Sequence, residues 1–200
     1  MTQIDAARDA PRQPGDRSGW PAEPRWTPGR AGPRHLQPWL LDQGSLTAKL
    51  VRESRGDFRV SVRRQGLARP RLSERRALGL GAGRWALVRE VVLWGEGQPW
   101  VFARSVIPLT SLTGRLRQLR RLQTRPLGGF LFAQPDLERG PIELSRMTPR
   151  NSSVPASLQG EEALWGRRSI FRLEARPLLV SEVFLPAFTQ RLLSMRERSS

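Results

Sequence analysis

The stretch WALVREVVLWGEGQPWVFARSVIP, residues 85–108, constrains the fold most, because it is typical of two antiparallel strands joined by a turn. Two strand-like apolar runs flank the glycine-rich sequence GEGQP. Near the C-terminus, SIFRL and PLLVSEVFLPAF flank EARP in the same way. Two hairpins without a regular strand–helix alternation favour an α+β domain with a single antiparallel β-sheet.

Each hairpin carries one charged residue within an apolar row. Side chains alternate across a strand with period two, so Arg89 shares a face with Leu87 and Val91, and Glu182 shares one with Val180. A charge on an apolar face is costly unless a partner compensates it. The residues alone leave three interpretations of Glu182 open: an exposed acid on an edge strand, a buried ion pair with Arg89, or part of a functional site.

Helices are expected around the hairpins. Pro38 suits the first turn of a short helix, and Ser45 can cap a second one. The leucine spacing over 108–125 predicts an amphipathic helix, with Thr110 as its N-cap and arginines on the solvated face. Pro-Leu-Gly-Gly at 126–129 predicts a sharp turn into another short helix.

Three further stretches are interpreted as irregular. Residues 67–83 predict a polar loop, and residues 145–160, rich in Ser and Pro, predict a mobile surface loop. GRRS, residues 166–169, predicts a turn that exposes Arg167 and Arg168. The alternative interpretation is that these two arginines steer an anionic ligand.

The first 34 residues differ in composition from the rest of the chain. They contain six prolines and four glycines and few large apolar side chains. Such a segment buries too little surface to offset the entropy of ordering it. We therefore expect a disordered tail over residues 1–34 and one domain over residues 35–200.

The composition excludes several kinds of site. The chain has no cysteine, which rules out disulfides and thiolate metal sites, and His35 is its only histidine. His35 lies beside a Pro/Gly-rich segment and is not expected to be catalytic. The chain has no apolar run of about 20 residues and no apolar signal-peptide core, so we expect a cytoplasmic protein without stable membrane insertion.

The net charge of +16 raises the question of a polyanionic partner. Lys49 is the only lysine, and the arginines are spread along the chain instead of forming one basic run. This distribution argues against nucleic acid as a partner. A small anionic ligand suits the positive field equally well.

Two stretches resemble chorismate pyruvate-lyase. They are ALVREVVLWGEGQPWVFARSVIPLTSL, followed by RPLGGFLF, and LWGRRSIFRLEARPLLVSEVFLPA, and the resemblance extends over roughly residues 36–188. It implies an antiparallel sheet whose helices cover an internal ligand pocket. It also implies a cofactor-free, monomeric enzyme that converts chorismate to 4-hydroxybenzoate and pyruvate, the first committed step of ubiquinone biosynthesis. The alternative is a non-catalytic effector-binding domain of related fold.

The resemblance also implies the site residues. Arg89 and Glu182 match the catalytic, substrate-binding arginine and glutamate of the family, and Leu127 with Gly128 matches its substrate-binding turn. Leu46 most nearly matches a substrate-contacting residue of the helical flap, where the family often has methionine. Whether Glu182 transfers a proton or only positions the substrate stays open at this point.

Overall fold

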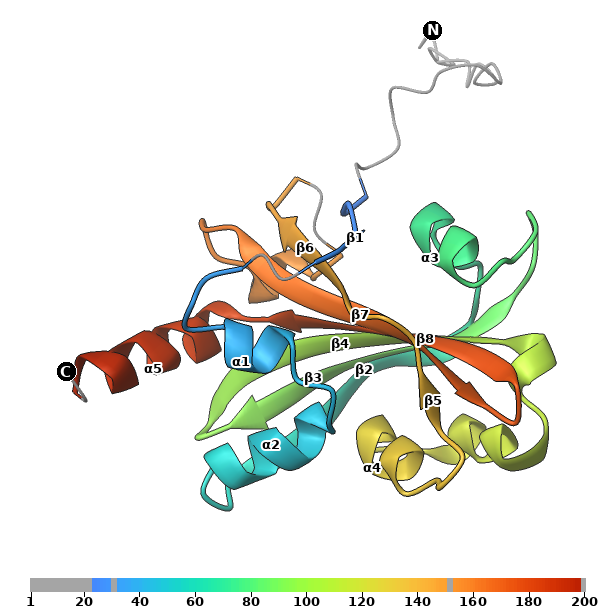
Figure 1. Ribbon diagram of the computed structural model, residues 1–200, viewed down its shortest axis with the longest axis horizontal. Helices are drawn as coiled ribbons and strands as arrows, with labels where there is room; N and C mark the ends of the chain where they lie inside the picture. Colours follow the sequence, from blue (N-terminus) through green and yellow to red (C-terminus); the bar gives the residue numbers. More distant parts are fainter. Residues whose placement is uncertain (1–22, 30–31, 151–152, 199–200) are drawn as a thin grey trace, which may run out of the picture.

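The computed structural model describes residues 23–29, 32–150 and 153–198. Within them, eight strands form one antiparallel sheet in the order β1-β6-β7-β8-β4-β3-β2, with β5 paired to β7 (Figure 1). The predicted α+β class with a single antiparallel sheet is confirmed. The strands are β1 (Thr27–Pro28), β2 (Phe58–Ala68), β3 (Ala86–Gly95), β4 (Gln98–Pro108), β5 (Glu138–Arg139), β6 (Glu143–Met147), β7 (Leu164–Leu173) and β8 (Arg176–Phe184).

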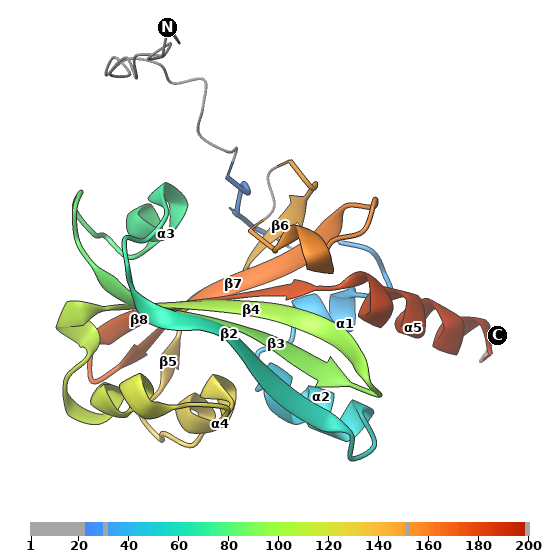
Figure 2. The same cartoon turned by 180° about the vertical axis from the view of Figure 1, so that it is seen from behind.

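Helices cover the two faces of the sheet unequally. α1, α2 and α4 lie on one face, here called the front face, and α3 lies on the other, the back face, while α5 extends from one end of the sheet (Figures 1 and 2). In the described residues, no helix is both long and apolar enough to cross a membrane. The helices are α1 (Gln37–Leu40), α2 (Leu46–Glu53), α3 (Leu72–Ala77), α4 (Leu127–Phe132), α5 (Pro186–Glu197) and the 3-10 segments η2 (Leu109–Ser111), η3 (Gly114–Arg121) and η4 (Ala156–Leu158).

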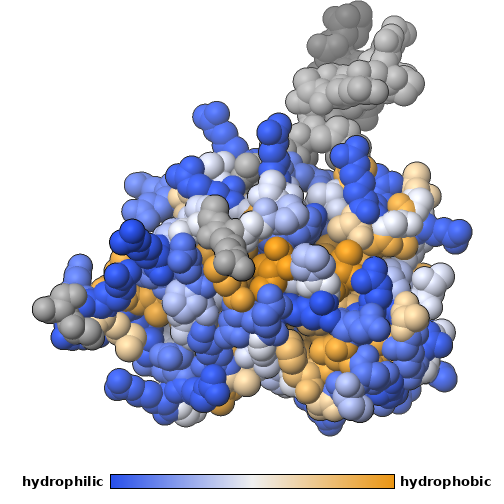
Figure 3. Space-filling model, in the orientation of Figure 1, coloured by the Kyte–Doolittle hydropathy of each residue, from blue (hydrophilic) through white to orange (hydrophobic). Residues whose placement is uncertain are grey.

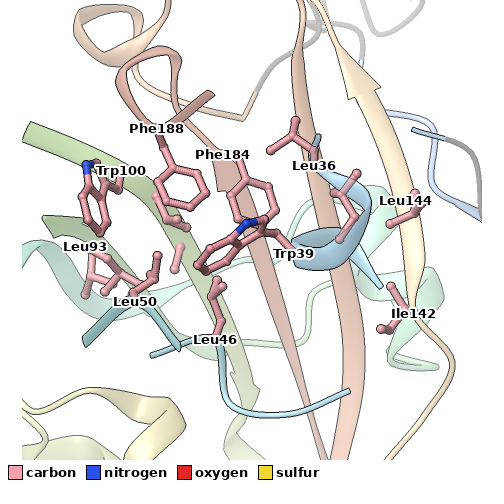
Figure 4. Close-up of a cluster of buried hydrophobic side chains, with 14 residues drawn as sticks. Leu36, Trp39, Leu46, Leu50, Leu93, Trp100, Ile142, Leu144, Phe184 and Phe188 are labelled. Carbon is pink, nitrogen blue, oxygen red and sulfur yellow. The ribbon is translucent and has the colours of Figure 1, made fainter. Parts of the chain in front are cut away.

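The largest hydrophobic cluster lies between α1, α2, the start of α5 and the front face (Figure 4). The ring of Phe188 packs edge-on against Trp39, with 4.8 Å between ring centroids, and stacks on Phe184 at 5.6 Å. Leu46 and Leu50 bury one side of α2 in the same cluster. Hydrophilic side chains cover much of the outer surface, and hydrophobic ones show mainly near the middle of the view in Figure 3. This packing fixes α2 over the sheet, beside the cavity described below.

The caps predicted for the first two helices are confirmed. Pro38 lies in the first turn of α1, and the Ser45 side chain accepts a hydrogen bond from the Ala48 amide at the start of α2. The single helix predicted over 108–125 is wrong, because the segment forms two short 3-10 helices. Gly114, at φ 51°, begins the second of them, next to the side chain of Glu174.

The prediction that the leucines of this segment are buried is nevertheless confirmed. Leu112, Leu116 and Leu119 are all at most 3% exposed. The leucines expected on the buried face of an α-helix are therefore buried in this segment as well. Thr110 lies inside η2 and does not cap a helix.

All three stretches interpreted as irregular contain regular structure, and residues 166–169 lie inside β7. Residues 67–83 include α3, whose first turn is closed by a hydrogen bond from the Arg71 amide to the Glu74 carboxylate. Residues 145–160 include the end of β6, where Ser145 and Met147 are buried. These two loop predictions are wrong for the same reason: contacts with strands distant in the sequence hold these polar segments in regular structure.

The expected N-terminal tail lies mostly outside the described residues, which omit 1–22 and 30–31. The described part packs on the domain: β1 pairs with β6, and the Arg168 guanidinium lies 4.9 Å from the Trp26 ring. The Glu23 carboxylate accepts hydrogen bonds from the Leu72 and Ser73 amides of α3, at 2.9 and 2.8 Å. The division at residue 34 stays a prediction.

A buried ion-pair network fixes α3 to the back face. Arg104 of β4 is 6% exposed, and its Nε donates to the Glu74 carboxylate at 2.6 Å. Its Nη1 donates to Glu90 of the neighbouring strand. Removing one partner of a buried ion pair leaves the other charge uncompensated.

We expect Glu74→Gln to lower the free energy of unfolding by roughly 3 kcal/mol, because it leaves Arg104 with only Glu90 and weakens the cap of α3. Urea denaturation measures the change. Glu161→Gln, at an exposed position, is the control and should be neutral. Equal stability of the two variants would contradict a structural role for the network.

Candidate active site

A cavity lies between the front face of the sheet and the helices α2 and α4. Its walls are largely apolar and include side chains of β2, β3, β8 and α4. The five residues that sequence analysis proposed as site residues all line this one cavity. They are Leu46, Arg89, Leu127, Gly128 and Glu182.

Arg89 reaches the cavity from the centre of β3 and is 3% exposed. Its Nη2 donates to the backbone carbonyls of Gln123 and Arg125, at 2.6 and 3.0 Å, and its buried Nε has no partner. It forms no ion pair with any described carboxylate. Burial lowers the pKa of Arg89, since an apolar environment disfavours the charged form. Arg89 is therefore a buried cation without a compensating anion.

Glu182 lies on β8 and is held in a partly buried ion pair, but its partner is Arg167 and not Arg89. The Arg167 Nε donates to the Glu182 Oε2 at 2.7 Å. The Arg167 Nη1 donates to the Trp39 and Asp42 carbonyls, both at 2.7 Å. The ion pair fixes the orientation of the Glu182 carboxylate.

The prediction of a turn at GRRS is wrong. Residues 166–169 lie inside β7, so Arg167 and Arg168 point to opposite faces of the sheet. Arg167, 1% exposed, faces the cavity, and Arg168 on the back face pairs with Glu143 at 2.6 Å. The two adjacent arginines favoured an exposed turn. If LWGRRSIFRL is instead a strand, side chains alternate between the two faces of the sheet, so one arginine lies on each face.

The Arg167–Glu182 pairing follows from the turn between β7 and β8. This turn has two central residues, Glu174 and Ala175, at φ 52° and 60°, a left-handed geometry that usually requires Asn or Gly. The prediction of a four-residue loop, EARP, at this position is therefore wrong. Counting strand pairs outward from the two-residue turn places Arg167 directly opposite Glu182.

A third arginine, Arg139, enters the cavity from β5. Its Nε donates to the Ser169 hydroxyl at 3.1 Å, and its Nη1 donates to the Asp42 and Gly44 carbonyls at 3.1 and 3.4 Å. Burial, with a smaller contribution from nearby Arg167, lowers the pKa of Arg139 to about 10. Sequence reasoning missed this residue because β5 is only two residues long and has no local pattern.

The cavity carries a net positive charge. Among the described lining residues, the charged ones are Arg89, Arg139, Arg167 and Glu182, so two positive charges are left uncompensated. Apolar walls weaken screening by water and so strengthen the attraction for an anion. The arrangement suits a small ligand with two negative charges and a hydroxyl group.

The predicted turn at 126–129 leads into α4 as expected. Leu127 and Gly128 begin this helix, against the start of α2, where Leu46 lies. A Cβ at Gly128 would lie 2.9 Å from the Thr47 Oγ1 and 3.3 Å from the Ser45 Oγ. Glycine at this position therefore allows α2 and α4 to approach each other above the cavity.

We expect Gly128→Ala to displace α2 from α4 and to raise KM several-fold, because the added methyl group overlaps Thr47. Steady-state kinetics with the substrate proposed below measures the effect. Gly129→Ala is the matched control, since its Cβ would meet no atom within 4 Å and alanine favours the helix. The same KM for both variants would contradict the packing argument.

Comparison with known proteins decides the family. The chorismate lyase family model matches residues 30–194. The chain belongs to the chorismate lyase family. A probable chorismate pyruvate-lyase of Thiobacillus denitrificans is 46% identical over 159 residues, covering 78% of this chain and 84% of the relative. One from Azoarcus sp. is 44% identical over 184 residues, covering 88% and 95%.

A solved effector domain has a similar fold. The effector domain of PhnF from Mycobacterium smegmatis matches with a TM-score of 0.51 and 14% sequence identity, covering 74% of this chain and 91% of that domain. At this identity the similarity concerns the fold alone. Family membership therefore rests on the sequence relatives and the family model.

Proposed function

We propose that this member of the chorismate lyase family removes pyruvate from chorismate and releases 4-hydroxybenzoate. The observation that carries the proposal is the cavity itself, with two uncompensated arginines and one fixed carboxylate within apolar walls. Chorismate carries two carboxylates and one hydroxyl, so its charge and hydrogen-bonding groups complement this lining. The family membership supports the same conclusion.

The reaction needs no group beyond the substrate and the side chains of the chain. The bond between the ring and the ether oxygen breaks, and the ring carbon that bears the hydroxyl loses a proton. The ring becomes aromatic, and the departing enolpyruvate becomes pyruvate when its methylene carbon gains a proton. The aromatic product supplies a strong driving force, so the protein contributes mainly orientation and charge stabilisation.

In this proposal, Arg89 and Glu182 bind the two polar groups at opposite ends of the ring, its carboxylate and its hydroxyl. The Arg89 guanidinium binds the ring carboxylate, because its Nε is buried without a partner and its charge is uncompensated. Leu127 and Gly128 also line the cavity. Glu182, held by Arg167, accepts a hydrogen bond from the ring hydroxyl. Leu46 closes the apolar wall from α2.

A non-catalytic effector-binding domain is the competing function. The fold is compatible with it, as the PhnF effector domain shows. The curated relatives argue for the enzyme, because they match at 46% and 44% identity over most of their length. A monomeric state, a cytoplasmic location and the absence of a nucleic-acid partner remain predictions.

Incubating the purified protein with chorismate tests the proposal. We expect 4-hydroxybenzoate and pyruvate to appear in equal amounts, measured by chromatography and by a coupled assay for pyruvate. Tight chorismate binding without product would favour the effector-binding domain. Folded protein that neither binds nor cleaves chorismate would contradict both functions.

A further inference from the structure

Strand β4 lies between the two strands that carry Arg89 and Glu182. Arg89 of β3 lies opposite Ser105 of β4, whereas Glu182 of β8 lies opposite Ala103 of the same strand. β3 and β8 are thus two strand spacings apart, roughly 10 Å across the sheet, and the two residues are also offset by two positions, about 7 Å, along the strands. This separation accommodates a six-membered ring between the two side chains.

Chorismate itself dictates where its second carboxylate must lie. The ring carboxylate and the hydroxyl occupy opposite ring positions, and the enolpyruvyl ether is attached to the carbon next to the hydroxyl. With the ring carboxylate at Arg89 and the hydroxyl at Glu182, the enolpyruvyl carboxylate falls near the Glu182 end. A buried carboxylate needs a cation there.

Two arginines lie near Glu182, and only Arg139 has a charge that no described carboxylate compensates. Arg167 already bonds to Glu182 and to two carbonyls. Arg139 bonds only to neutral oxygens, two of them at 3.1 Å and one at 3.4 Å, so its positive charge is not neutralised by these contacts. Arg139 also forms no ion pair with a described carboxylate. Its guanidinium lies 5.2 Å from the ring of Phe171, which lines the same cavity.

We propose that Arg139 binds the enolpyruvyl carboxylate of chorismate, while Arg89 binds the ring carboxylate. This assignment rests on the proposed function. As the ether bond breaks, negative charge develops on the departing enolpyruvate, and Arg139 stabilises that charge. The product 4-hydroxybenzoate lacks the enolpyruvyl group, so Arg139 distinguishes substrate from product.

The difference between substrate and product supplies the test. Arg139→Gln should raise KM for chorismate roughly 10- to 30-fold, the loss expected for one charge-assisted hydrogen-bonded contact. The inhibition constant of 4-hydroxybenzoate should change by less than roughly 3-fold. Arg139→Lys, which keeps the charge, should recover part of the loss in KM. Arg172→Gln, exposed on β7, is the control and should resemble the wild type.

Each other result overturns the assignment. If Arg139→Gln weakened the binding of chorismate and of 4-hydroxybenzoate equally, Arg139 would contact the ring portion that both molecules share. If KM and the inhibition constant were both unchanged, Arg139 would not bind the substrate. If Arg139→Gln does not fold, the same comparison with Arg139→Lys decides. An inactive wild type would refute the proposed function, whereas an active wild type without the substrate–product difference refutes only the role of Arg139.

Discussion

Replacing Arg89 by methionine is expected to lower kcat/KM for chorismate by roughly 10²- to 10³-fold. Methionine fills much of the same volume, so the variant removes the guanidinium while the apolar packing is largely kept. A substrate carboxylate at this buried position would then have no cationic partner, a loss of the size measured for truncated buried charge pairs. Steady-state kinetics measures the change, and 4-hydroxybenzoate should also inhibit more weakly.

Arg89 also holds the loop before α4 through the Gln123 and Arg125 carbonyls, so folding must be checked. Thermal unfolding of the variant serves that purpose, and Arg64→Met, exposed on the neighbouring strand β2, is the matched control. Arg89→Lys should be intermediate, because lysine keeps the charge but loses the planar fork. A folded Arg89→Met protein with wild-type kinetics would exclude Arg89 from substrate binding.

Glu182→Gln is expected to lower kcat/KM by roughly 10- to 100-fold. The amide has nearly the shape of the carboxylate and can still accept a hydrogen bond from Arg167 through its oxygen. The variant loses the negative charge that strengthens the hydrogen bond from the ring hydroxyl, an effect of about 1.5–3 kcal/mol. The kinetic assay used for Arg89 measures it.

The size of this loss separates the two roles that the sequence left open for Glu182. A residue that moves the proton typically contributes 10²- to 10⁴-fold to catalysis, so a fall above roughly 10³-fold in kcat would assign proton transfer to Glu182 and contradict a positioning role. Glu143→Gln is the matched control, because Glu143 pairs with Arg168 on the opposite face of the same sheet. It should leave kinetics unchanged.

Strand periodicity indicated two of the charged residues that line the cavity before any three-dimensional information. It placed Arg89 and Glu182 on apolar faces, and both side chains line the cavity. It could not pair them correctly, because pairing depends on strand register. The register of β7 and β8 depends on a Glu174–Ala175 turn without the usual glycine or asparagine, so no turn motif indicated this register.

Local sequence patterns could not predict the positions of residues that depend on contacts with distant segments of the chain. Arg139 follows α4 and reaches the cavity only because its two-residue strand pairs with β7. α3 was interpreted as a loop, since the contact that fixes it is made by Arg104, 30 residues from Glu74 along the chain. In both cases, the position of a polar segment is determined by long-range contacts that periodicity does not encode.

A crystal structure of the protein with bound 4-hydroxybenzoate tests the central claim most directly. We predict the product inside the cavity between the sheet and the helices α2 and α4, with its carboxylate on Arg89 and its hydroxyl on Glu182. Glu182 should keep its ion pair with Arg167. Product bound elsewhere on the molecule, or bound in the cavity without contact to Arg89 or Glu182, would contradict the account.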